Sequence, residues 1–175
     1  MRRRRGSNRA DSKSSKQLNK KPKTKPRAEK KYTHAQMKKK VDEWCSKFVR
    51  WSAADEDGFA KCYTCGKEDH VSKLQAGHFA SRRHLNTRWD HEWNIRVQCV
   101  SCNLYSQGEQ WVFGKALDKE RPGVSTEVMR RSKQLKKFGM PELRKMYEWY
   151  KEQCDELAKR KKVRIKKKKI KNEFT

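Results

Sequence analysis

Apolar residues recur at intervals of three or four in a segment near the start of the chain and in another near its end. The first, over residues 34–54, predicts an amphipathic helix, because this spacing places the apolar side chains on one face. The second belongs to the last of the helices that we expect between residues 125 and 158. Its stripe contains Leu143, Met146, Tyr147, Tyr150, Cys154 and Leu157. The two stripes have near-heptad spacing, which predicts packing on each other within one chain or between two chains of a homodimer.

Between these helices, residues 59–110 are dense in Cys, His, Asn, Gly and aromatic residues. Short β-like runs occur at residues 74–79 and 94–100. This composition predicts a small unit that folds around a metal ion rather than around a large apolar core. The predicted organisation is a disordered basic arm over residues 1–31, one domain over residues 32–158, and a basic tail over residues 159–175.

The chain has 175 residues and a formal net charge of +26, which is concentrated at its two ends. Residues 1–40 carry +15 and residues 159–175 carry +9, whereas residues 41–158 carry only +2. This charge indicates a polyanionic partner such as DNA, to which the ends would attach the protein without selecting a sequence. No run approaches the roughly 18 apolar residues of a membrane span, and no secretory signal is present. We therefore expect a cytoplasmic protein with no membrane partner.

Four of the six cysteines form two Cys-x-x-Cys pairs, Cys62 with Cys65 and Cys99 with Cys102, separated by 33 residues. In a reducing compartment such pairs favour metal binding over disulfides. Four thiolates close a tetrahedral Zn²⁺ site with no open position, which is the structural rather than the catalytic arrangement. The alternatives are a redox pair or four unrelated core cysteines. The other two cysteines lie on helical apolar stripes and are interpreted as core residues.

Three short motifs accompany the cysteine pairs. The first β-like run contains Ala-Gly-His-Phe at residues 76–79, the second begins with Asn94, and Asn103 directly follows the last cysteine. A strand that ends in His, a strand that starts with Asn, and an Asn that opens a helix suggest a ββα active site. In their order along residues 62–108, the motifs resemble the NinG (Rap) family of lambdoid phages. More broadly they resemble the zinc-bound HNH and endonuclease VII-like nucleases.

The resemblance implies an α+β fold in which a small zinc-bound ββα-metal (HNH-like) core is flanked by α-helices. It also implies a metal-dependent, structure-selective endonuclease that hydrolyses phosphodiester bonds in branched DNA such as Holliday junctions and D-loops. By this resemblance His78 is the general base, Asn94 orients the base and its loop, and Asn103 ligates a catalytic Mg²⁺ or Mn²⁺. Imidazole suits the base role on chemical grounds too, because its ordinary pKa of about 6.5 leaves it mostly neutral near pH 7.

One position departs from the pattern of many HNH enzymes, in which an Asp directly before the base is a second metal ligand. Here that position is Gly77. Asp90, His91 and Glu92 lie between the two β-like runs, and we expect one of them to supply the missing ligand. The sequence does not choose among the three.

Four arginines near the predicted site are expected to contact phosphates, namely Arg82, Arg83, Arg88 and Arg96. Phe79, Trp89 and Trp93 are interleaved with them, and would either stack on unpaired bases or pack in the small core. Two other functions stay open. One is a non-catalytic zinc-containing basic DNA-binding protein, and the other is an HNH nuclease that cuts ordinary duplex DNA.

Overall fold

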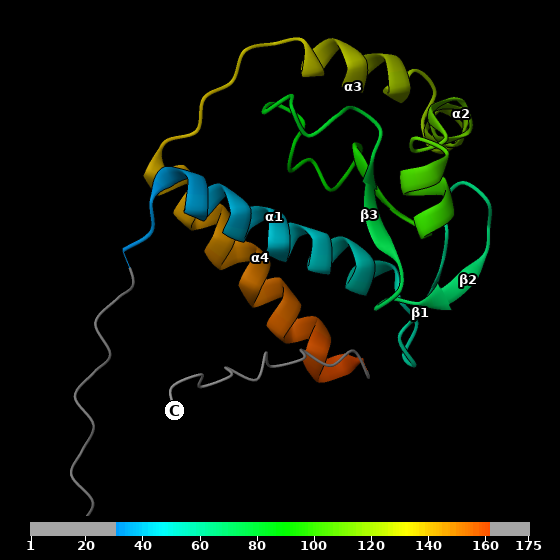
Figure 1. Cartoon of the computed structure of the whole chain (residues 1–175), viewed down its shortest axis with the longest axis horizontal. Coiled ribbons are helices and arrows are strands. Elements are labelled where there is room, and N and C mark those ends of the chain that lie inside the picture. Colours follow the sequence, from blue (N-terminus) through cyan, green and yellow to red (C-terminus); the bar gives the residue numbers. More distant parts are fainter. Residues whose placement is uncertain (1–30, 162–175) are drawn as a thin grey trace, which may run out of the picture. The chain divides into compact units, whose positions relative to one another are not determined.

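The computed structural model describes residues 31–161, which form helices and two small antiparallel sheets (Figure 1). The predicted arm lies outside the described residues apart from Lys31, and the predicted tail lies outside them beyond residue 161. Within the described part, no helix has the length and apolar character needed to cross a membrane.

Helix α1 spans His34–Ala53, compared with residues 34–54 in the prediction. It begins at Thr33, whose hydroxyl accepts a hydrogen bond from the Gln36 backbone N–H at 3.3 Å. The Gln36 side chain in turn accepts from the Thr33 backbone N–H at 2.9 Å. This reciprocal capping box satisfies two N–H groups that the first turn of a helix leaves without partners. The buried face of α1 includes Met37, Val41 and Cys45.

Helix α4, Met140–Arg160, lies beside α1 and packs against it within the same chain (Figure 1). Its buried residues, Leu143, Tyr150, Cys154 and Leu157, belong to the stripe seen in the sequence. The rings of Trp44 and Tyr147 meet edge to face at 6.4 Å across the contact. Of the two arrangements predicted for the stripes, the structure adopts packing within one chain. The stripes are therefore not free to form a dimer interface, and the homodimer stays an untested prediction.

Two short antiparallel hairpins follow α1. Strand β1, Phe59–Lys61, pairs with β2, Glu68–His70, and strand β3, Gln75–His78, pairs with β4, Ile95–Gln98. In the second hairpin Gly77 lies opposite Arg96 and His78 lies opposite Ile95. Beyond the strands the hairpins are tied together, because the Tyr63 N–H donates to the Val97 carbonyl at 2.8 Å.

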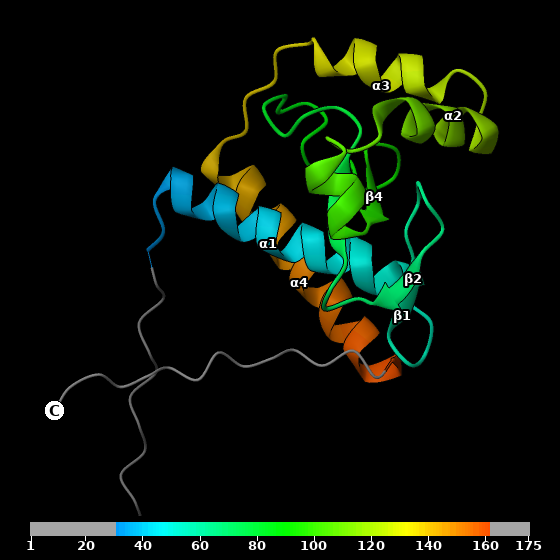
Figure 2. The same ribbon diagram turned by 45° about the vertical axis from the view of Figure 1, so that its right-hand side comes forward.

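A π-helix, η1 (Ser101–Tyr105), follows β4, and helices α2 (Gln110–Glu120) and α3 (Val124–Ser132) come next. The hairpin of β3 and β4 lies between the α1/α4 pair and the α2/α3 pair (Figure 2). Each pair buries its own apolar cluster. The cluster beside α2 and α3 consists of Ala80, Phe113, Leu117, Val124 and Val128. The hairpin is therefore supported from both sides, which holds the residues at its ends in place.

Candidate active site

The four paired cysteines lie together, with all of their Sγ atoms within 4.8 Å of one another. The Sγ atoms of Cys65 and Cys99 are 3.8 Å apart. This is the separation expected for two ligands of a tetrahedral ion at a metal–sulfur distance of about 2.3 Å. Three of the cysteines are buried and Cys65 is exposed. The prediction of a four-cysteine cluster that could bind a metal such as zinc is confirmed.

Each cysteine pair occupies a tight turn. The first lies between β1 and β2, where the Gly66 N–H donates to the Cys62 carbonyl at 2.9 Å and Gly66 has a φ of 72°. Glycine suits this left-handed conformation because it has no Cβ. The second pair opens η1, where the Asn103 N–H donates to the Cys99 carbonyl at 3.0 Å. A metal held by the cysteines would therefore fix the backbone that carries Asn103.

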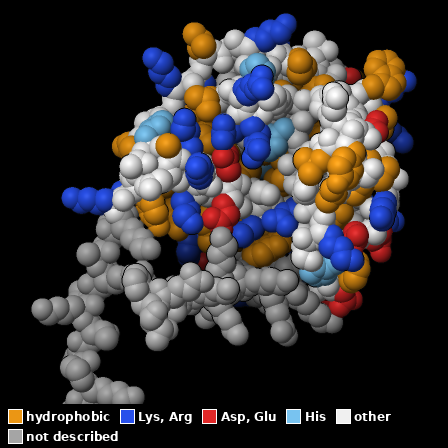
Figure 3. Space-filling model, viewed as in Figure 1, with side chains coloured by type: hydrophobic (Ala, Val, Ile, Leu, Met, Phe, Trp, Pro, Cys, Tyr) orange, Lys and Arg blue, Asp and Glu red, His pale blue; other side chains and the backbone are white. Residues whose placement is uncertain are grey.

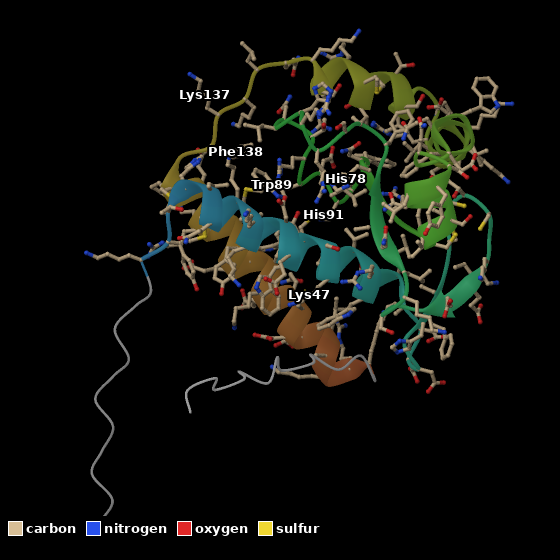
Figure 4. The ribbon with its side chains drawn as sticks, viewed as in Figure 1. Lys47, His78, Trp89, His91, Lys137 and Phe138 are labelled. Atoms are coloured by element: carbon tan, nitrogen blue, oxygen red, sulfur yellow. The ribbon has the colours of Figure 1, made fainter. Side chains whose placement is uncertain are left out.

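His78 lies at the end of β3, on the side that faces α1 (Figure 4). Its Nε2 is 3.0 Å from the backbone carbonyl oxygen of Arg88. A carbonyl can only accept, so Nε2 carries the proton and Nδ1 keeps the lone pair in the neutral ring. Burial lowers the pKa of His78 to about 4, although hydrogen bonds of the ring to the Arg88 and Ala76 backbone oppose the shift. The ring is therefore neutral at physiological pH.

Asp42 of α1 holds the loop that provides this carbonyl. Its carboxylate accepts two hydrogen bonds from the Arg88 guanidinium, at 2.9 and 2.6 Å, and one from the Trp89 indole N–H at 2.7 Å. Burial opposes ionisation, but the bonds from Arg88 hold the pKa of the Asp42 carboxyl below its ordinary value. The sequence analysis did not identify this residue, because Asp42 and Arg88 are separated by 46 positions.

Asn94 is fully buried and is saturated by hydrogen bonds within the same loop. Its Nδ2 donates to the carbonyls of Ala80 and Thr87, at 3.0 and 2.8 Å, and its Oδ1 accepts from the Ala80 N–H at 2.6 Å. These bonds close the loop between β3 and β4. The geometry is that of a residue that positions its surroundings, with no side-chain atom left for substrate.

His78 and Asn103 line one cleft of about 750 Å³. The Asn103 Nδ2 donates to the Oε1 of Gln75 at 2.5 Å, which orients the amide of Asn103. Arg50 and Arg82 also line the cleft, and none of its described lining residues is Asp or Glu. Arg50 is anchored by a 2.8 Å bond from its Nη1 to the Val71 carbonyl. Nothing in the sequence distinguished Arg50 from a surface arginine of a helix.

The three residues proposed as further metal ligands do not line this cleft. Asp90 forms an ion pair with Arg131 at 2.9 Å. His91 stacks on the Trp149 ring at 5.3 Å, and its Nδ1 is 2.8 Å from the Tyr150 hydroxyl, which itself donates to the Trp89 carbonyl. Glu92 is exposed. The structure thus does not bring any of the three to Asn103.

The predicted phosphate-binding arginines divide into two groups. Arg82 and Arg83 are exposed, and Arg82 lines the cleft. Arg88 is held by Asp42, and Arg96 forms a 2.8 Å ion pair with Glu120. Both of these are half-buried and occupied by internal partners, so their geometry indicates a structural role.

The aromatic residues named with these arginines pack against buried side chains, although only Trp89 is itself buried. Trp89 is 5% exposed. Phe79 packs on Phe113 with ring centroids 5.6 Å apart, and Trp93 packs beside the same cluster. Of the two roles weighed for these residues, the structure supports packing for Trp89 and Trp93, whereas Phe79 is half-buried and also lines the cleft.

The space beside Gly77, where the sequence comparison expected an Asp, is filled by Gln98. A Cβ at position 77 would lie 1.8 Å from Gln98 Oε1. Gln98 is itself fully buried, and its Nε2 donates to the Gly108 carbonyl at 2.9 Å. A carboxylate therefore has no room at this position.

Comparison with known proteins finds one family. Residues 1–162 match the family model described as Bacteriophage Lambda NinG protein. No curated protein and no solved structure matches the chain. The family match covers the cysteine cluster, the cleft, and the helices that support them.

Proposed function

Because the chain belongs to the NinG family of bacteriophage lambda, a family associated with phage recombination, we propose that it is an endonuclease that cuts branched DNA. The substrates that we propose are recombination intermediates such as Holliday junctions and D-loops. The proposal includes an HNH-like ββα core, formed by the β3–β4 hairpin and η1. The short η1 is a π-helix, a form that often occurs at functional sites.

The observation that supports the proposal most strongly is the state of His78. Its Nε2–H is bound to the Arg88 carbonyl, its ring is neutral, and it lines a cleft that also contains Arg50 and Arg82. A neutral imidazole with one nitrogen anchored can accept a proton at the other. A histidine with only a packing role would not need to line an open cleft beside Arg50 and Arg82.

The reaction proposed for this site is hydrolysis of one phosphodiester bond. The Nδ1 of His78 takes a proton from water, the water oxygen bonds to phosphorus, and the P–O bond to the leaving sugar oxygen breaks. The leaving oxygen is protonated from solvent. Arg50 and Arg82 offset the negative charge that builds on the phosphate, since fixed positive groups act strongly in a partly enclosed site. Asn94 and Asp42 position the loop that orients His78.

The donor set of the cleft fits a catalytic Mg²⁺ or Mn²⁺ poorly. Proteins usually hold Mg²⁺ through one or two carboxylates. Asn103 could offer its amide oxygen to a cation, because its Nδ2 is the atom that is bound to Gln75. None of the described residues that line the cleft offers a carboxylate. We therefore assign no step to a protein-bound cation, and treat dependence on Mg²⁺ or Mn²⁺ as a quantity to be measured.

Zinc at the four cysteines has a structural role in this proposal. The cluster has four ligands and no open position, so an ion there would hold the turns and would not contact the phosphate.

The proposal is tested by offering the full chain a synthetic four-way junction and a linear duplex of the same sequences. Each is incubated with Mg²⁺, with Mn²⁺ and without added cations. We expect cleavage of the junction at a rate at least tenfold above that of the duplex. Equal cleavage of both would favour a nuclease for ordinary duplex. Binding without cleavage under every condition would favour the non-catalytic zinc protein, an alternative that the missing carboxylate supports.

A further inference from the structure

Four large apolar side chains close to each other in the sequence are exposed, and one of them, Leu104, lines the cleft. Leu104, Tyr105, Trp111 and Val112 are 57%, 81%, 73% and 39% exposed. They come from the end of η1 and the start of α2. Figure 3 shows hydrophobic side chains gathered on the surface over this part of the molecule, with Lys and Arg side chains beside them. We call these four residues the apolar rim.

The backbone presents the apolar rim rigidly. Between η1 and α2, Gln107, Gly108 and Glu109 have successive φ values of 49°, 86° and 50°. Residues other than glycine seldom adopt this conformation, and such strain is concentrated at functional positions. The turn is pinned, because the Gly108 N–H donates to the Cys102 carbonyl at 2.8 Å and the Gly108 carbonyl accepts from buried Gln98. The rim is thus a fixed feature rather than a loose loop.

The apolar rim is continuous with the cleft that contains His78. Leu104 lines the cleft together with Gln107, Gly108 and Gln110 of the same turn. The Gln110 side chain also reaches the His78 carbonyl at 3.5 Å. A substrate whose phosphate enters the cleft would therefore bring its neighbouring groups to Leu104, and the adjacent Tyr105 extends the apolar surface away from the cleft.

The charges around the apolar rim suit a nucleic acid. Within the part of the chain that the structure describes, the charged residues of the cleft are Arg50 and Arg82, and its His78 is neutral at physiological pH. Lys115 Nζ lies 4.4 Å from the centre of the Trp111 ring. An exposed aromatic ring with a cation over it, beside a positively charged cleft, provides a stacking surface and a phosphate contact together.

We propose that Tyr105 and Trp111 stack on unpaired nucleobases next to the cut phosphate, so that the apolar rim recognises the unpaired region of branched DNA. This inference rests on the proposed function for the position of the phosphate. It assigns base stacking to Tyr105 and Trp111, which are far more exposed than buried Trp89 and half-buried Phe79 and Trp93.

The test uses the full chain without added Mg²⁺, Mn²⁺ or chelator, so that the zinc cluster stays intact, and binding is read before any cleavage is detectable. The probe is a DNA fork whose first unpaired base is 2-aminopurine, and the reference is a fully paired duplex of equal length. Trp111→Ala and Tyr105→Ala are compared with Leu135→Ala, which removes a fully exposed apolar side chain outside the cleft. Unchanged unfolding midpoints establish that the variants are folded.

We expect Trp111→Ala to weaken fork binding by about tenfold, the effect of losing one stacked base, and Tyr105→Ala to weaken it in the same direction. Duplex binding should change by less than about twofold, and Leu135→Ala should change neither. The wild-type chain should quench 2-aminopurine fluorescence and Trp111→Ala should not. Equal losses on fork and duplex, or unchanged fork binding and quenching, would overturn the proposal.

Sedimentation of the same proteins tests the alternative that a second copy of the chain covers the apolar rim. If Trp111→Ala converts a dimer to a monomer while fork binding per dimer is unchanged, the rim is an interface between copies and the proposal is wrong. The proposed nuclease function has a separate readout, because it requires cleavage by the wild-type chain with added cations. Fork-specific stacking without any cleavage would therefore support the proposed stacking role of the apolar rim and contradict the proposed endonuclease activity.

Discussion

The Nε2–H of His78 donates to the backbone carbonyl of Arg88 across 3.0 Å, and this bond fixes which nitrogen of the ring can accept a proton. Arg88 is in turn held by Asp42, a residue of α1. A helix far from His78 in the sequence therefore controls the orientation of the proposed base. The arrangement leads to the first prediction.

Asp42→Asn should reduce both stability and catalysis. The substitution removes the negative charge that faces the Arg88 guanidinium in a half-buried pair, so we expect a loss of about 2 kcal/mol in the free energy of unfolding. The loop that carries the Arg88 carbonyl would shift, and kcat for junction cleavage should fall at least about tenfold because the base is misplaced. Urea unfolding and single-turnover kinetics measure the two effects.

Glu43→Gln is the matched control, because Glu43 neighbours Asp42 in α1 but forms exposed pairs with Lys40 and Lys47. Exposed pairs contribute about 0 to 1 kcal/mol to the free energy of unfolding, and Glu43 does not hold the loop that carries the Arg88 carbonyl. Equal effects of Asp42→Asn and Glu43→Gln would show that the Asp42–Arg88 contact has no special role.

Zinc should be present at one ion per chain and should be required for folding. Cys62→Ser or Cys99→Ser removes a thiolate from the cluster, and we expect loss of bound zinc with unfolding or aggregation. Elemental analysis and circular dichroism report the two outcomes. Cys154→Ser is the control, since Cys154 is buried between α1 and α4 and lies outside the cluster. Zinc-free wild-type protein that is folded would contradict the assignment.

Gly77→Ala should destabilise the protein by about 3 kcal/mol or more, because its Cβ would lie 1.8 Å from Gln98 Oε1 in a fully packed region. The double variant with Gln98→Ala makes room for the methyl group. We therefore expect Gly77→Ala to cost less in a Gln98→Ala background than in the wild type. A double-mutant cycle by urea denaturation measures the difference. Costs that simply add would show that the two residues do not compete for space.

The stability of the protein should fall as the pH decreases from about 6.5 to about 4, in part because of His78. The pKa of His78 is about 4 in the fold and about 6.5 in an unfolded chain, so the unfolded state binds the extra proton first. This difference corresponds to about 3 kcal/mol across that window. His78→Asn removes this contribution, while the effects of His91 and the cysteines are common to both proteins. Identical pH dependence in the two would contradict the lowered pKa.

Local patterns in the sequence were informative where they depend on near neighbours. The helical spacing predicts residues 34–54, and α1 occupies His34–Ala53. The spacing of Cys62, Cys65, Cys99 and Cys102 predicted a cluster that the structure contains. Both inferences rest on geometry that a turn or a helix imposes on its own residues.

Long-range pairing limited the rest of the prediction. Arg88 and Arg96 resemble phosphate-binding residues in the sequence, but their partners Asp42 and Glu120 lie 46 and 24 positions away. For the same reason the sequence could not show that Trp89 is buried while Trp111 is exposed. Asp90 lies in a suitable loop for a metal ligand, yet Arg131 of α3 holds it outside the cleft.

The most direct test of the account is the rate of four-way-junction cleavage by His78→Asn under single-turnover conditions, at enzyme concentrations that saturate the DNA. Junction affinity without added Mg²⁺, Mn²⁺ or chelator and zinc content are measured on the same preparation, so that a binding or folding defect is distinguished from a chemical one. If His78 is the general base, cleavage falls by about a thousandfold while affinity and zinc content are unchanged. Cleavage within a fewfold of the wild-type rate would contradict the account.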